Sequence, residues 1–225
     1  NDIYVNDTTN SNWMNNNPAE WYTLAGGIGF AGNFDGAGYK IYGLYKNDTP
    51  KQYLGDKYTG PGKEAEWVNV GTALFPYIDP AAQIRNVHIR DSYLVGEGTV
   101  GAIAGNCMNG DANTRLQFIA CSVDESVTLK GFTVGGILGA SHSRGVDLTY
   151  CYSTAKMSNT GPSNRLSGLI GDIWSAKVSA LETYTTDYQV TFGSLVNTTA
   201  LYAPVEQFGV TVLNKADMIG SKAKA

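Results

Sequence analysis

The chain has 225 residues, of which 43% are hydrophobic and only 16% are charged, and its 27 glycines and 14 tyrosines favour strands and tight turns over helices. The net charge of −4 and the scattered basic residues argue against nucleic-acid binding, because neutralising phosphates requires clustered Lys and Arg. No apolar stretch approaches the roughly 18–20 residues of a membrane span, so no membrane insertion of this segment is expected.

Residues 1–33 begin with an asparagine-rich stretch, in which Trp13 and Trp21 are the expected buried anchors. We interpret this segment as an N-terminal cap or lead-in, because the first rung of a repeat fold otherwise exposes core side chains and edge hydrogen-bonding groups. The chain starts at Asn1 rather than at Met and shows no signal peptide, so we expect it to be a processed or trimmed piece of a longer polypeptide.

A turn and a strand come next, before a break in the pattern. Residues 35–38 predict a tight turn, and the alternation from Tyr39 to Tyr45 predicts a half-buried strand. Residues 46–69, rich in glycine, proline and charge, are interpreted as an inserted surface loop. Such a loop can carry binding or can simply be tolerated without a function.

A glycine-rich hexapeptide then recurs, and its fullest copy is Val-Gly-Gly-Ile-Leu-Gly. The copies occupy residues 71–76, 100–105, 134–139 and 166–171, so their last residues are 29, 34 and 32 positions apart. A second apolar signature starts at residues 84, 118, 148 and, more weakly, 181. A third short strand is predicted at residues 93–96, 127–131 and 155–158. A near-fixed period of this size indicates a stacked-repeat architecture.

Three short strands per unit predict an all-β fold, a right-handed single-stranded parallel β-helix (solenoid) of about five rungs. Matched apolar residues should then stack ~4.8 Å apart as ladders that face inward. The predicted ladders are Leu74, Ile103, Ile137 and Leu169; Ile41, Ile84, Phe118, Leu148 and Leu181; and Leu44, Val87, Cys121, Cys151 and Tyr184.

The second and third ladders lie three residues apart, which has the wrong parity for one flat strand. A corner or bulge must therefore separate them, and the same holds for Val134 and Ile137. Gly135, Gly136 and Gly139 are the expected corner residues there, because glycine tolerates a positive φ.

We place the β-helix at residues 34–203 and a closing segment at 204–225. In the closing segment a short strand is predicted at residues 210–213. Asn214 then resembles an N-cap, with Asp217 three residues later, so a truncated helix or linker is expected to start there.

Several of these motifs resemble one known family. The pattern Gly-Asn-Phe-Asp-Gly-x-Gly-Tyr-x-Ile-x-Gly-Leu at residues 32–44, the glycine-rich strand and the apolar strand that follows it are similar to the GLUG repeats of bacterial surface proteins. Residues 208–218 resemble the segment that closes such arrays. Departures from the family pattern are Pro76, Ser167, Ala120 and Tyr150. The resemblance implies a module of a large, secreted or surface-attached bacterial protein that acts in adhesion, with no shared catalytic residue.

Parallel β-helices also include polysaccharide lyases and glycoside hydrolases, whose sites need carboxylates on adjacent rungs. Asp91, Asp124 and Glu125 could form such a patch over two rungs, or they could be ordinary solvated turn residues. No basic residue joins them at the third rung, as a lyase would require. We therefore assign no catalytic residue, no cofactor and no metal site, and we expect a protein that is not an enzyme.

Of the three cysteines, Cys121 and Cys151 should be stacked neighbours, while Cys107 is expected to lie unpaired in a turn. The stacked pair could be a disulfide or a reactive thiol pair, or it could simply fill the core. Neighbouring side chains in register on parallel strands point the same way, which makes disulfide geometry awkward.

Tyr150, Tyr152 and Tyr184 are the candidate ligand-binding residues, since an exposed aromatic strip can stack on sugar rings or anchor a protein partner. The alternative is that they are ordinary core and surface tyrosines. The sequence thus favours a non-catalytic module, located outside the cell or on its surface, that binds an extracellular glycan or a host protein or acts as a spacer between other modules of its polypeptide. The alternative function is a carbohydrate-active enzyme.

Overall fold

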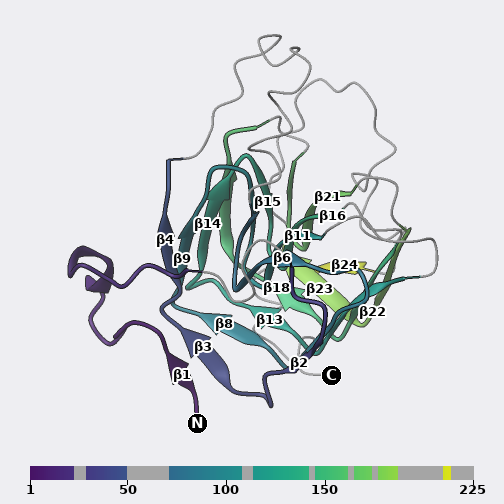
Figure 1. The fold of residues 1–225 in the computed structure, drawn as a ribbon, viewed down its shortest axis with the longest axis horizontal. Coiled ribbons are helices and arrows are strands. Elements are labelled where there is room, and N and C mark those ends of the chain that lie inside the picture. The colour runs from purple at the N-terminus through teal and green to yellow at the C-terminus, as the bar shows by residue number, and fades with distance from the viewer. Residues whose placement is uncertain are drawn as a thin grey trace.

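The computed structural model describes residues 1–22, 29–49, 71–107, 114–141, 145–161, 165–173, 177–186 and 210–213. In this part the chain forms an all-β parallel solenoid whose strands lie in five sheets (Figure 1). The helical structure among the described residues is a single 3₁₀ turn, η1 (Trp13–Asn15), and none of them belongs to a helix long and apolar enough to cross a membrane.

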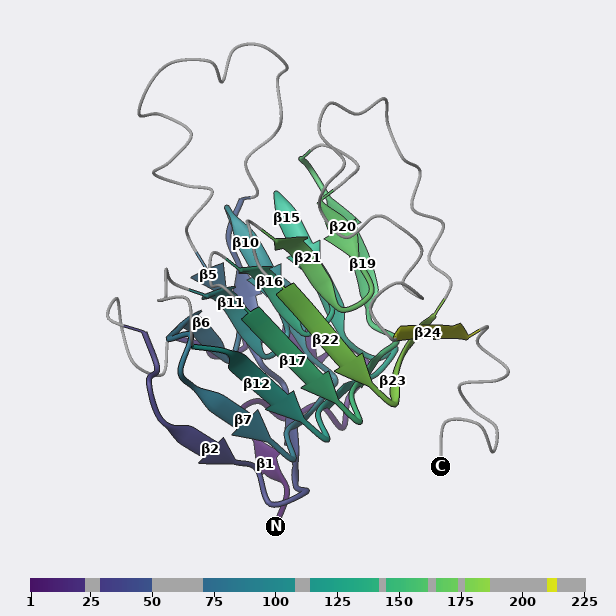
Figure 2. The same cartoon turned by 90° about the vertical axis from the view of Figure 1, so that its right-hand side faces the viewer.

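The five sheets are built from strands of two to five residues, and all paired strands run parallel. Sheet A contains β1 (Ile3–Tyr4), β3 (Lys40–Tyr42), β8 (His88–Arg90), β13 (Ser122–Val123), β18 (Tyr152–Ser153), β23 (Thr183–Thr186) and β24 (Val210–Leu213). Sheet B contains β6 (Phe75–Ile78), β11 (Ala104–Cys107), β16 (Leu138–Ser141) and β21 (Ile170–Ile173). Sheet C contains β2 (Asn33–Asp35), β7 (Gln83–Arg85), β12 (Leu116–Ile119), β17 (Gly145–Thr149) and β22 (Lys177–Leu181), and Figure 2 shows it face-on.

Sheets D and E complete the coil. Sheet D contains β4 (Tyr45–Asn47), β9 (Tyr93–Val95), β14 (Thr128–Gly131) and β19 (Lys156–Asn159). Sheet E contains β5 (Gly71–Thr72), β10 (Thr99–Gly101), β15 (Thr133–Gly135) and β20 (Leu166–Ser167). Along the sequence the chain passes through sheets C, A, D, E and B in turn, and then returns to sheet C.

The prediction of three strands per repeat is wrong, because each repeat passes through five. Both apolar signatures straddle a corner, and the chain changes sheet within them. The signature that starts at Ile84 is divided between β7 and β8, and the glycine-rich copy at 134–139 is divided between β15 and β16. Apolar character and the backbone hydrogen bonds between successive turns both continue through these corners, so the sequence pattern does not separate the two strands.

The first predicted ladder is confirmed. The backbone nitrogen of Ile103 donates to Ile137, and that of Ile137 donates to Leu169, at 3.1 and 2.9 Å. Leu74 occupies the same position one turn earlier, and all four side chains are buried.

The second ladder is wrong at both ends. Ile84 pairs with Phe34 instead of Ile41, and Leu148 pairs with Ala180 instead of Leu181. A slip of one residue moves a side chain to the opposite face of a strand, and Leu181 is accordingly 55% exposed.

The third ladder holds at Val87, Cys121 and Cys151, and it continues to Thr183 rather than to Tyr184. The sulfur of Cys151 and the hydroxyl of Thr183 both donate to a carbonyl of the preceding turn, which identifies them as equivalent positions. Leu44 belongs to a different ladder, because its carbonyl pairs with the nitrogen of Tyr93 at the start of sheet D.

The corner predicted between the second and third ladders is confirmed. It lies between sheets C and A, at Asn86, Ala120, Tyr150 and Glu182, whose φ angles of 54°, 52°, 55° and 46° are left-handed. This single left-handed residue reverses the parity, so that the apolar residues on either side of it both face inward.

The glycines of the repeat are not explained by the predicted reason, which was their tolerance of a positive φ. Among the described residues, glycines with positive φ are Gly29, Gly38 and Gly43, and not those of the hexapeptide. A Cβ atom on Gly139 would lie 2.5 Å from the carbonyl oxygen of Gly105 and 2.8 Å from the nitrogen of Val100. Glycine is required there because the backbones of sheets E and B touch.

The N-terminal segment contributes to the sheets. Strand β1 pairs with β3 at the end of sheet A, and Phe30 forms a bridge with Ile78 at the end of sheet B. Trp13 is buried at 8% exposure, as predicted, whereas Trp21 is partly buried and donates its indole N–H to the carbonyl of Leu74 at 3.3 Å.

Two predicted segments fall partly outside the described residues. Of the loop predicted at 46–69, residues 46 and 47 belong to β4, and residues 50–69 lie outside the described part. The strand predicted at 210–213 is confirmed as β24, which pairs with β23, while the helix predicted from Asn214 lies outside the described part.

Candidate functional site

The outer face of sheet A carries most of the polar and aromatic side chains that the sequence singled out. In this sheet alternate residues point inward and outward. The inward positions in register are Ile41, Ile89, Val123, Ser153 and Thr185. The outward positions in register are Lys40, His88, Ser122, Tyr152 and Tyr184. The outward row therefore runs across five neighbouring strands of sheet A.

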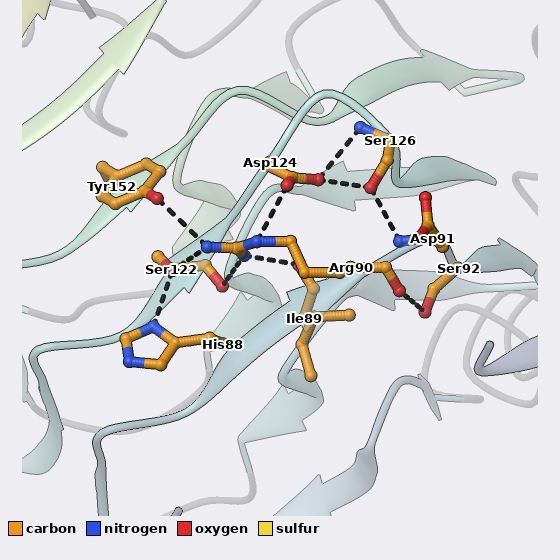
Figure 3. Close-up of polar contacts among 9 residues, drawn as sticks. All are labelled: His88, Ile89, Arg90, Asp91, Ser92, Ser122, Asp124, Ser126 and Tyr152. Atoms are coloured by element: carbon orange, nitrogen blue, oxygen red, sulfur yellow. Dashed lines mark hydrogen bonds and ion pairs between the residues drawn. The ribbon is translucent and has the colours of Figure 1, made fainter. Parts of the chain in front are cut away.

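Arg90 joins three of these turns, as Figure 3 shows. Its guanidinium donates to the hydroxyl of Ser122 at 2.9 Å and to the phenol oxygen of Tyr152 at 3.1 Å, and its Nε is 2.8 Å from a carboxylate oxygen of Asp124. It also donates to the carbonyl oxygens of Ile89 and Ser122. The Arg90 side chain is only 12% exposed, so these contacts hold it firmly against the sheet.

His88 and Ser122 lie 2.7 Å apart, measured from Nδ1 to Oγ, but they are not arranged as a catalytic triad. The carboxylate of Asp124 binds Arg90 instead of orienting the imidazole, and Ser122 is only 2% exposed, out of reach of a substrate. Burial, with the positive charges of Arg90 and Lys40, lowers the pKa of His88. A neutral imidazole that accepts a hydrogen bond from the Ser122 hydroxyl fits this environment.

The acidic residues lie at the corner between sheets A and D, whose length varies from turn to turn. His88 to Tyr93 spans five positions and Tyr152 to Lys156 spans four, whereas the equivalent segment from Ser122 to Thr128 spans six. The longer corner contains Asp124, Glu125 and Ser126. The predicted alignment of acidic residues is therefore displaced here, since the chain holds one more residue than in the turn before.

The three acidic residues have different surroundings. Asp124 is occupied by the ion pair with Arg90, and it also accepts hydrogen bonds from the nitrogen and hydroxyl of Ser126. Asp91 has a left-handed φ of 42°, and its backbone nitrogen donates to the Ser126 hydroxyl at 2.7 Å. Glu125 is exposed on the longer corner. Among the described residues there is no group of three or more His, Cys, Asp or Glu placed to hold a metal ion.

The three candidate tyrosines lie on neighbouring turns. Tyr152 and Tyr184 are in register on the outer face of sheet A. The Tyr184 hydroxyl donates to Glu182 at 2.6 Å, and this bond raises the pKa of Tyr184. Tyr150 is 56% exposed at the left-handed corner that precedes β18.

The cysteines have a structural environment. Cys121 and Cys151 occupy adjacent turns of one ladder, as predicted, and both are buried free thiols that donate to backbone carbonyl oxygens. Burial raises the pKa of the Cys151 thiol well above its ordinary value, which disfavours the reactive thiolate. Cys107 is buried at the end of β11, so the turn predicted for it is wrong.

Sequence reasoning missed Arg90 as the residue that links the outward row. Alignment of the repeats does place His88, Ser122 and Tyr152 at one position, and the register confirms it. The long Arg90 side chain crosses to the neighbouring turns, however, and the direction in which it extends is not encoded in the repeat pattern.

In comparisons with known proteins, no family model matches the sequence and no curated protein matches it. Among solved structures there is a match to the crystal structure of a "putative immunoglobulin A1 protease" from Bacteroides ovatus. The sequence identity is 14% and the TM-score is 0.45, over 92% of this chain and 76% of the other. A likeness this distant carries no argument about function.

Proposed function

We propose that this chain is a non-catalytic binding module that recognises an extracellular glycan through the outer face of sheet A. The observation that carries the proposal is the pair Tyr152 and Tyr184, which lie side by side in register on this face. Rings on adjacent strands, ~4.8 Å apart, can contact the apolar face of a sugar, and tyrosine combines an apolar ring with a polar group.

The two rings are held before any ligand arrives. Arg90 donates to the hydroxyl of Tyr152, and Glu182 accepts from the hydroxyl of Tyr184. Fixing a side chain in advance reduces the entropy lost when a ligand binds. Tyr150, exposed at the corner, extends the aromatic surface toward sheet C.

A non-catalytic role is supported by the engagement of an acidic residue beside this face. Asp124 is bound by Arg90 and by Ser126, so its carboxylate is not available as an acid or base. The buried Ser122 hydroxyl likewise lies out of reach of a substrate.

The finer assignments belong to the same proposal. We propose a right-handed β-helix of about five rungs with residues 1–33 as its cap, from a multi-module bacterial protein of the GLUG-repeat family that is secreted or attached to the cell surface. The support is the set of motifs in residues 32–44 and in the glycine-rich copies. Adhesion is the role that such a module would have.

A glycan array tests the proposal, with the whole chain as the probe. We expect binding to one class of glycans, weakened at least tenfold by Tyr152→Ala and by Tyr184→Ala. Tyr22→Ala is the matched control, because Tyr22 is exposed on the N-terminal segment and lies beside Lys46 of sheet D. Circular dichroism of each variant verifies that the fold is kept.

Three results would contradict the proposal. The first is an array on which the chain binds nothing. The second is glycan binding that Tyr152→Ala and Tyr184→Ala leave unchanged. The third is turnover of a polysaccharide that Asp91→Asn or Glu125→Gln abolishes, which would indicate the enzyme alternative.

A further inference from the structure

A cavity of about 230 Å³ lies between the N-terminal segment and the corner that joins sheets A and D. One wall comes from the N-terminal segment and includes Thr8, Ser11 and Trp13. The opposite wall comes from the corner and includes Asp91, Ser126 and Thr128. None of the residues of the outward row of sheet A lines the cavity. The corner that contains Asp91 and Ser126 lies next to both.

Departures from the regular repeat form both walls of this cavity. On the corner side, the extra residue between Ser122 and Thr128 lets Ser126 extend to the preceding turn and accept the backbone N–H of Asp91. On the other side, the amide of Asn6 donates to the carbonyl oxygens of Gly43 and Ala19, at 2.7 and 3.0 Å. The N-terminal segment is thereby fastened across the end of the corner.

The polar groups in the cavity suit a ligand with several hydroxyls. Within the described part of the chain the carboxylate of Asp91 has no hydrogen-bond or ion-pair partner, because Arg90 is committed to Asp124. Thr8, Ser11 and Thr128 line the same space, and a hydroxyl can both donate and accept hydrogen bonds. A carboxylate accepts hydrogen bonds only, so it is suited to the adjacent hydroxyls of a sugar.

The size of the cavity and its apolar surfaces restrict the class of ligand further. A volume of about 230 Å³ is below the ~300–1,000 Å³ of pockets for drug-sized ligands, so it suits one small ring. Trp13 and Tyr93 supply aromatic surface, and the ring of Tyr93 stacks on that of Tyr45 with centroids 5.9 Å apart. One carboxylate without a second acidic ligand is a poor site for a divalent cation.

We propose that this cavity binds one neutral pyranose unit, with Asp91 accepting hydrogen bonds from two neighbouring sugar hydroxyls. The proposal deepens the proposed function and rests on it, since the cavity would hold a terminal or branching sugar of the glycan that contacts sheet A. The left-handed φ of Asp91 is compatible with this role, because strained backbone persists where the surroundings hold it.

Isothermal titration calorimetry on the whole chain tests the proposal with six sugars. These are glucose, galactose, mannose, fucose, N-acetylglucosamine and N-acetylgalactosamine. We expect at least one to bind at millimolar concentration and Asp91→Asn to weaken that binding at least tenfold. Asparagine has the same shape and adopts left-handed φ readily, so the variant should fold. Thr128→Val, also isosteric, provides a second removal of a polar group.

The matched control is Asp79→Asn, at the corner between sheets B and C, which should bind the sugar as the unmodified chain does. Binding of none of the six sugars would overturn the cavity proposal, and so would equal binding by Asp91→Asn and Thr128→Val. If tyrosine-dependent array binding occurs without sugar binding, the cavity proposal alone fails. If Asp91-dependent sugar binding occurs on a chain whose array is blank, the outer-face proposal alone fails.

Discussion

Between sheets C and A the chain turns at Ala120 and Tyr150, which have left-handed φ angles although neither is glycine. Around the corner between sheets E and B lie the glycines of the repeat, whose φ angles are not left-handed, and a Cβ on Gly139 in β16 would collide with the backbone of Gly105 and Val100. The first corner accepts backbone strain and keeps its side chains. The second gives up side chains so that two sheets can touch. Glycine in the hexapeptide repeat therefore marks close packing of backbones rather than a left-handed turn.

The same comparison locates the candidate sites. At the glycines beside the corner of sheets E and B there is no room for a Cβ, and the side chains at the corner itself are buried in the core, so this corner serves the packing of the coil. The corners on either side of sheet A carry Tyr150, Asp91 and Ser126, and the sheet between them carries Tyr152 and Tyr184. The repeat motif is thus most regular where the chain carries the fewest candidate binding residues.

The largest expected effect is that of Gly139→Ala. The added Cβ meets backbone atoms at 2.5 and 2.8 Å, and backbone cannot rotate away, so we expect a loss of about 3 kcal/mol in the free energy of unfolding. The control is Gly38→Ala, where φ is 76° and no atom lies within 4 Å, so only a conformational cost of about 1 kcal/mol is expected. Urea unfolding measures both. Equal losses would contradict the distinction between packing and conformation.

Removing the guanidinium of Arg90 should have the second largest effect on the free energy of unfolding. Arg90→Met leaves Asp124 without its cation and Tyr152 without its donor, so we expect a loss of about 2 kcal/mol. Arg85→Met is the control, because the pair of Arg85 with Asp35 is about half exposed and should contribute less than about 1 kcal/mol. A comparable loss in the two variants, measured by urea unfolding, would show that Arg90 is not a structural centre.

A smaller effect, of opposite sign, is expected at the corner of sheets C and A. Ala120→Gly relieves a left-handed φ of 52° and should stabilise the chain by about 0.5 kcal/mol, after the entropy cost of glycine is subtracted. Ala140→Gly, in sheet B and without a positive φ, should destabilise it by about 1 kcal/mol. Thermal unfolding of the two variants measures the signs, and a loss of stability in Ala120→Gly would refute the strain argument.

The smallest expected effect is a pH dependence due to His88. Since burial lowers its pKa in the folded state, the unfolded chain binds more protons at mildly acidic pH. The contribution of His88 is therefore fully present above its ordinary pKa of about 6.5, and it is lost as the pH falls toward the folded value. We expect the unfolding temperatures of the unmodified chain and of His88→Gln, measured between pH 8 and pH 5.5, to diverge below about pH 6.5. Parallel curves would contradict this.

Much of the fold could be predicted because the repeat is strict where burial is complete. The ladder of Ile103, Ile137 and Leu169 follows from the period alone. At the ends of the coil the repeat is degenerate, and there two ladder residues were predicted wrongly: Ile41 lies in sheet A, paired with Ile89, and Leu181 is displaced by one residue of register. A pattern of period two cannot resolve a shift of one residue when few copies are available.

The sequence by itself determined the stacked parallel fold and the need for a corner between two apolar positions, because both follow from period and parity. Only the tertiary structure decided that each repeat has five strands, that the glycines pack backbone on backbone, and that Arg90 ties the outward row together. The cavity beside Asp91 is likewise a product of tertiary structure. Its walls are distant in the chain: the hydrogen bonds of Asn6 fasten one of them, and the other is a corner longer than the corners of the adjacent turns, a difference that acquires meaning only when the turns are stacked.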